Sequence, residues 1–166
     1  VLSPRKPSVA DWANAMRCCH QAGLPGSANI VFGSIETPEE IVEHLRIIRD
    51  IQDETGGFFS FVPWTFQPQT ERFPICPVRG DEYLKMVALA RLWFDNIRHI
   101  EVSLLGQGME LGELALRGGA DDINSVVIEE NVLKSRGPAS IQAANDFIQQ
   151  AGFTPRRRNF SFHPVE

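Results

Sequence analysis

The sequence predicts an α/β fold of about four strand and helix pairs, preceded by one further helix. Short apolar runs alternate with longer segments whose apolar residues recur at helical spacing. Glycines and prolines separate these segments, and no low-complexity linker interrupts them. Strands that alternate with helices of ten or more residues pair in parallel through right-handed crossovers. We therefore expect one parallel sheet in a single domain spanning residues 1–166.

The strongest helix signal lies in the first third of the chain. A helix is expected over about Asp11–Gln21, and a short apolar strand over Ser27–Phe32. Thr37 is a candidate N-cap, with Pro38 at the first helical position and Glu40 completing a T-x-x-E capping box. The apolar stripe of this helix, which Gly56 is placed to end, consists of Ile41, Val42, Leu45, Ile48 and Ile51.

The next unit contains an unusually long loop. A strand is expected over Gly57–Val62 and a helix over Asp81 to about Asn96, with about twenty residues between them. Long ordered loops in compact domains are usually functional. The expected apolar face of the helix comprises Leu84, Val87, Ala88 and Leu92.

The last two units are shorter. We expect a strand over His99–Leu105, a helix over about Met109–Leu116 and a strand over Asp122–Ile128. A final helix is expected to start at Pro138 and to end before Gly152. Its apolar face consists of Ile141, Ala144 and Ile148.

Four such units are half of a (βα)8 TIM-type barrel, and we expect this chain to form the C-terminal half of one. A half-barrel sheet has two unpaired edges and one uncovered face. It needs a partner, either an N-terminal half that is missing from this chain or a second copy. Exposed edges would favour dimerisation. A small, open, doubly wound sheet is the structural alternative.

Composition excludes several classes of protein. A hydrophobic content of 43%, a charged content of 22% and a net charge of -5 are ordinary for a globular domain and unlike a nucleic-acid-binding surface. No apolar run reaches the roughly 18 residues of a membrane helix, and no signal peptide is visible, so we expect a cytoplasmic protein. Three cysteines, two of them adjacent, suit reduced thiols. These exclusions leave a small molecule or another protein as the expected partner.

Unusual residues gather after the predicted strands, where the active sites of barrels lie. Each group also has a structural explanation as a turn or a solvated surface, and spacing alone does not decide between the two. The groups are Gly33 to Glu36, Pro63 to Pro68, Gly106 to Gly108, and Glu129 to Asn131.

Other chemical candidates are weaker. The four histidines lack metal-ligand spacing, which argues against zinc. Cys18 and Cys19 fall within a helical pattern and are expected in or near the core. The basic run Arg156–Arg158 is expected to be a solvated tail or an ion-pair partner.

Several stretches together resemble a known family. QDETGGFFSFVPWTFQP, GADDINSVVIEENV and AGFTPRRRN are similar to the C-terminal half of the radical SAM enzymes of the futalosine pathway of menaquinone biosynthesis. Aminofutalosine synthases and deazaflavin cofactor synthase subunits share much of the pattern. The form PWTFQP favours the members that cyclise dehypoxanthine futalosine. The resemblance covers nearly the whole chain.

The resemblance implies a (βα)8 barrel that uses S-adenosylmethionine and a [4Fe-4S] cluster to generate a radical, with an electron donor protein as partner. NIVFGSIE then aligns with a G-x-I-x-G-x-x-E pattern: Gly33 and Glu36 match, whereas Asn29 and Val31 depart from it. The residues implied at the cofactor are Gly33, Ser34, Glu36, Val62 and Pro63. Those implied at a nucleoside-like substrate are Trp64, Thr65, Gln67, Glu129, Glu130 and Asn131.

Two features of this chain differ from the family pattern. The cluster-binding C-x-x-x-C-x-x-C is absent, so its cysteines are expected upstream of Val1, and this chain alone is expected to be inactive. Ser103-Leu104-Leu105 stands where relatives usually carry Trp. The alternatives are a non-catalytic half-barrel that binds a nucleoside-like ligand or a partner chain, and part of the sister transferases.

Overall fold

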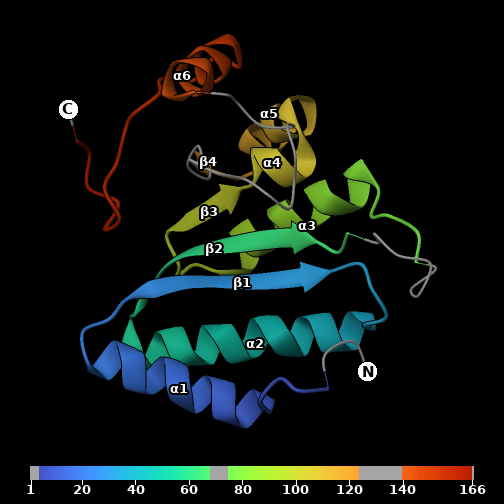
Figure 1. Cartoon of the computed structure of the whole chain (residues 1–166), viewed down its shortest axis with the longest axis vertical. Helices are drawn as coiled ribbons and strands as arrows, with labels where there is room; N and C mark the ends of the chain where they lie inside the picture. Colours follow the sequence, from blue (N-terminus) through green and yellow to red (C-terminus); the bar gives the residue numbers. More distant parts are fainter. Residues whose placement is uncertain (1–3, 68–74, 124–139, 166) are drawn as a thin grey trace.

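The fold is a four-stranded parallel sheet with helices packed against it, as Figure 1 shows for a computed structural model that describes residues 4–67, 75–123 and 140–165. The strands are β1 (Gly26–Phe32), β2 (Phe58–Thr65), β3 (His99–Val102) and β4 (Asp122–Ile123), in the order β1-β2-β3-β4. The helices are α1 (Val9–Gln21), α2 (Pro38–Thr55), α3 (Gly80–Trp93), α4 (Leu104–Gln107), α5 (Met109–Arg117) and α6 (Ile141–Gln150). The α/β class and the parallel pairing are confirmed, and the sheet is compatible with half of a barrel.

The start and the end of α2 are confirmed in detail. The Thr37 hydroxyl accepts from the Glu40 amide at 3.3 Å, and the Glu40 carboxylate accepts from the Thr37 amide at 2.8 Å. Pro38 occupies the first turn, where its missing N–H has no helical partner to lose. Gly56 ends the helix with a left-handed φ of 63°.

The core lies between the sheet and the helices. Its fully buried side chains include Leu45, Ile48, Ile51, Phe61, Tyr83, Val87, Phe94, Ile97 and Ile100. Two expected core residues are instead exposed, Val42 by 46% and Leu92 by 84%. Leu92 lies two residues beyond buried Ala90, which places it on the opposite side of α3. The expected face is confirmed for Val87, which is fully buried, and for Leu84, which packs against the core; only Leu92 lies off the packed face of α3.

The expectation that β2 ends at Val62 is wrong, because the strand continues to Thr65. Pro63 pairs with Ile30 of β1, and the pairing runs on to Thr65 opposite Phe32. The Phe66 amide donates to the Phe32 carbonyl at 2.7 Å, so alternation along the strand turns the nitrogen of Pro63 toward β3.

The β3 side of β2 tolerates this proline. There the paired register covers only Ser60 opposite His99 and Phe61 opposite Ile100. Pro63 therefore stands where no donor is required, which is the position that a strand allows to proline.

The strand expected over His99–Leu105 is also shorter than predicted. It ends at Val102, because the Ser103 hydroxyl accepts from the Gly106 amide at 3.3 Å and caps α4. Leu104 thereby becomes a buried helical residue. The last helix begins at Ile141 and not at Pro138, because Ser140 is extended and its hydroxyl caps α6 by accepting from the Ala143 amide. The strand predicted beyond Ile123 lies outside the described residues.

Among the described residues, no helix combines the length and the apolar character needed to cross a membrane.

Candidate ligand site at the carboxyl ends of the strands

The turn after β1 is organised around the carboxylate of Glu36. This carboxylate accepts hydrogen bonds from the amides of Gly33 and Ser34, the latter at 3.0 Å, and from the Ser34 hydroxyl at 2.5 Å. Partial burial raises the pKa of Glu36, but these hydrogen bonds outweigh it and the net pKa is lowered. The structure thus brings Gly33, Ser34 and Glu36 together around an ionised carboxylate.

Gly33 is required by its surroundings. Its φ of 87° is left-handed, and a Cβ built on it would overlap the Cγ2 methyl of Val78, which precedes α3. The turn after β1 and the segment before α3 therefore pack against each other directly. This contact explains the glycine without any ligand.

A second polar group forms at the end of β2. The Thr65 hydroxyl accepts from the Gln67 side-chain amide at 2.8 Å and from the Gln107 side-chain amide at 2.9 Å. Gln107 is the last residue of α4, so two loops that are distant in sequence meet at Thr65. Trp64, next to Thr65, is half-buried and pairs with Val31, which is 56% exposed.

The sequence-predicted residues thus fall into three sets. Gly33, Ser34 and Glu36 form the first cluster, and Thr65 and Gln67 the second. Val62 and Pro63 are buried in β2, and the expectation that their backbone meets a cofactor stays a prediction. Glu129, Glu130 and Asn131 lie outside the described residues.

Gln107 is the residue that sequence reasoning missed. The sequence places the run Gly106–Gly108 at the expected active-site edge but assigns no role to the Gln107 side chain. Its position was the available signal, because the carboxyl ends of neighbouring parallel strands lie at one edge of the sheet. The side-chain contact with Thr65 depends on α4, which no sequence pattern predicted.

The described part of the chain does not fit an iron-sulfur cluster. It contains no group of three His, Cys, Asp or Glu residues that could hold a metal ion. Cys19 on α1 is half-buried, but Cys18 and Cys76 are exposed, which corrects the expectation that both adjacent cysteines lie in or near the core. Three thiolates at one point cannot come from these positions.

The amino-terminal end of the sheet carries a separate charge cluster. Arg158 donates to both carboxylate oxygens of Asp122, at 2.5 and 2.7 Å, and lies 3.5 Å from the carboxylate of Glu101. The Ser60 hydroxyl donates to that same Glu101 carboxylate. The Arg158 guanidinium also lies 3.7 Å from the ring centroid of Phe162. The expectation of an ion-pair role in the basic run is confirmed for Arg158.

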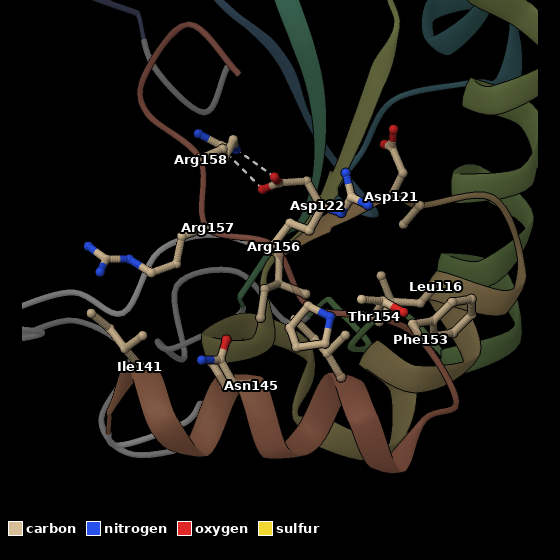
Figure 2. Close-up of a pocket in the computed structure, with 15 residues that line it drawn as sticks. Leu116, Asp121, Asp122, Ile141, Asn145, Phe153, Thr154, Arg156, Arg157 and Arg158 are labelled. Carbon is tan, nitrogen blue, oxygen red and sulfur yellow. Dashed lines mark hydrogen bonds and ion pairs between the residues drawn. The ribbon is translucent and has the colours of Figure 1, made fainter. Parts of the chain in front are cut away.

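A cavity of about 620 Å³ lies beside this cluster, between β4, α6 and the C-terminal segment. Figure 2 shows Arg158 turned toward Asp122, whereas the neighbouring Arg157 makes no such contact with the residues drawn. The cavity wall contains none of the candidate site residues. Ile123 and Ile141, which lie near the two ends of the undescribed segment 124–139, both contribute to the wall, so we assign no ligand to this cavity.

Residues 55–166 match the protein family described as the CofH/MqnC C-terminal region. The chain belongs to this family. It is 39% identical, over 95% of its length, to a cyclic dehypoxanthine futalosine synthase of Streptomyces coelicolor. It is 38% identical over 99% of its length to the synthase of that name from Halalkalibacterium halodurans.

A second group of CofH/MqnC relatives has a different name. A 5-amino-6-(D-ribitylamino)uracil–L-tyrosine 4-hydroxyphenyl transferase of Methanococcus maripaludis is 32% identical over 99% of the chain. These relatives are longer proteins, of which the chain covers 41%, 45% and 49%. The chain therefore spans about half the length of the curated relatives that it matches.

Proposed function

We propose that this chain forms part of a radical SAM enzyme that cyclises dehypoxanthine futalosine in menaquinone biosynthesis. The observation that carries this proposal is the 39% identity to a cyclic dehypoxanthine futalosine synthase over 95% of the chain. Transferases of the second group match less well, at 32% identity over 99% of the chain or at 38% over only 82% of it. The polar groups that follow β1 and β2 support the proposal, because barrel enzymes bind their substrates at this edge of the sheet.

We assign the turn after β1 to the cofactor side and the end of β2 to the substrate side. When bound, S-adenosylmethionine and a [4Fe-4S] cluster supply the radical chemistry, and the cluster ligands come from outside the described residues. Glu36 holds the amides of Gly33 and Ser34 in a fixed turn that can border the cofactor. Thr65 and Gln67 offer hydrogen bonds to a nucleoside-like substrate, beside the ring of Trp64.

We further propose that the remaining strands of a (βα)8 barrel complete this sheet at β1. Within the described chain β1 is an edge strand, and its seven residues pair only with β2. An exposed parallel edge that carries apolar side chains such as Val31 needs a covering partner. The greater length of the relatives makes an additional segment of the same protein our preferred partner over a second copy.

The proposal is tested with the complete protein, reconstituted anaerobically with iron, sulfide, S-adenosylmethionine and a reductant. We expect dehypoxanthine futalosine to be converted to its cyclic product, followed by liquid chromatography and mass spectrometry. Conversion of L-tyrosine with 5-amino-6-(D-ribitylamino)uracil instead would assign the protein to the transferase group. The 166-residue chain treated in the same way serves as the control and should show no cluster absorbance.

A further inference from the structure

We propose that Gln107 is a positioning residue that fixes the Thr65 hydroxyl as a hydrogen-bond donor to an oxygen of the substrate. The ligand class is a carbonyl or carboxylate oxygen presented at the carboxyl end of β2. The identity of the substrate rests on the proposed function. The orientation of the hydroxyl rests on the geometry around Thr65.

The argument starts from the hydrogen-bonding capacity of a hydroxyl, which has two acceptor positions and one donor hydrogen. At Thr65 the side-chain amides of Gln67, at 2.8 Å, and Gln107, at 2.9 Å, both donate to the hydroxyl oxygen. Both acceptor positions are therefore filled. Among the described residues no group accepts the remaining hydrogen, so it is available to a ligand.

The two glutamines contribute differently to this arrangement. Gln67 is exposed and lies only two residues from Thr65, so its bond is local and faces solvent. Gln107 is half-buried and comes from α4, and its backbone amide donates to the Ser103 carbonyl at 3.0 Å. Gln107 is thus held by its helix and fixes Thr65 from a separate loop. A donor that is oriented before binding loses less rotational freedom when the ligand arrives.

The chemistry that fits this site follows from the direction of the free hydrogen. A donor with both acceptor positions occupied favours ligand oxygens without hydrogens over ligand N–H groups. Carbonyl and carboxylate oxygens meet this condition. Thr65 is also close to Trp64, whose ring can stack on a planar part of the same substrate.

The test compares four variants of the complete reconstituted enzyme. Thr65→Val removes the hydroxyl at nearly constant volume, and Thr65→Ser keeps it. Gln107→Glu replaces the donor amide with a carboxylate, which accepts the Thr65 hydrogen and turns it away from the substrate. We expect Thr65→Val and Gln107→Glu each to raise KM about tenfold while kcat changes less than about threefold. Thr65→Ser should keep KM within about threefold of the wild type.

The fourth variant combines Thr65→Val with Gln107→Glu. If Gln107 acts through Thr65, the double variant is no worse than Thr65→Val alone, because the two changes remove the same interaction. Gln149→Glu on the exposed side of α6 makes the same charge change far from the site and serves as the matched control. We expect it to leave KM unchanged.

Failure of this inference is distinguishable from failure of the proposed function. Unchanged KM values in Thr65→Val or Gln107→Glu, or multiplicative losses in the double variant, overturn the positioning role even if dehypoxanthine futalosine is converted. If the wild type converts only the transferase substrates, the proposed function is wrong, and the same KM comparison is made with those substrates. A wild type that neither converts nor binds either substrate in calorimetry overturns both.

Discussion

The two ends of the sheet satisfy their polar groups in opposite ways. At the amino-terminal end, Arg158 donates to both oxygens of Asp122, the first residue of β4, and Phe162 of the C-terminal segment stacks on His99, the first residue of β3. At the carboxyl-terminal end, Thr65 is fixed by two amides yet keeps a hydrogen that no described residue accepts. The chain's own C-terminal segment satisfies polar groups at the first end, whereas the second end keeps the hydrogen-bond donor that we propose for the substrate.

Aromatic packing also stabilises the amino-terminal end of the sheet around Arg158 and Asp122, which we call the closed end. Phe162 stacks on His99 at a centroid distance of 4.1 Å, and both Phe160 and Phe162 contact Phe59. Phe162 has a left-handed φ of 60°, which is uncommon for a bulky residue. Such a conformation persists only where surrounding contacts hold it. The ring contacts of Phe162 and the ion pair of Arg158 therefore fix the same short segment.

The largest effect is expected from removing Arg158. Arg158→Met leaves Asp122 and the 5% exposed Glu101 as neighbouring carboxylates without their shared cation. We expect the free energy of unfolding at pH 7 to fall by about 2 to 4 kcal/mol, measured by urea denaturation. Arg157→Met, at an exposed neighbouring position, should change it by less than about 0.5 kcal/mol.

A compensating change sharpens this prediction. Burial, helped by the nearby charge of Asp121, raises the pKa of Asp122 although the hydrogen bond and the charge of Arg158 lower it. Ionised Asp122 is therefore costly once Arg158 is removed, and adding Asp122→Asn to Arg158→Met should recover part of the lost stability. If the two losses simply add, the ion pair does not explain the closed end.

The second prediction concerns the carboxyl-terminal end of the sheet, where the expected loss of stability is somewhat smaller. Gly33→Ala forces a Cβ into Val78 at a φ of 87°, whereas Gly56→Ala meets a φ of 63° with no atom within 4 Å. Both variants carry backbone strain, but only Gly33→Ala adds a clash. We expect losses of about 2 to 3 kcal/mol for Gly33→Ala and about 1 kcal/mol for Gly56→Ala, compared by urea denaturation. Equal losses would mean that Val78 moves away at little cost.

The closed end was far harder to predict from sequence than the fold. Local signals were sufficient for α2, because the capping residues Thr37 and Glu40 and the terminal Gly56 act over a few residues. Arg158 and Asp122 are 36 residues apart, and no spacing rule relates an arginine in a tail to a strand carboxylate. Their meeting depends on the path of the chain after α6.

The carboxyl-terminal end of the sheet could be predicted only in part. The residues after β1 could be located because strand ends in a parallel sheet share one edge. The extension of β2 through Pro63 was missed, because its tolerance depends on which neighbouring strand faces the missing N–H. Gln107 was missed because its contact with Thr65 spans 42 residues. Resemblance to relatives, and not spacing, suggested what this edge binds.

The smallest effect separates a structural carboxylate from a catalytic one at Glu36. Its pKa in the folded protein lies below the unfolded value of about 4.5, so its contribution to stability is present above that pH and is lost as the pH falls through the folded value. Glu36→Gln should therefore cost about 1 kcal/mol at pH 7 and progressively less below about pH 4.5. Urea denaturation of both proteins between pH 3 and pH 7 measures this difference, with Glu110→Gln on the exposed first turn of α5 as the control. A cost that does not change with pH would show that the turn depends on the shape of the side chain and not on its charge. A loss of activity at pH 7 with no loss of stability would instead place Glu36 against a ligand.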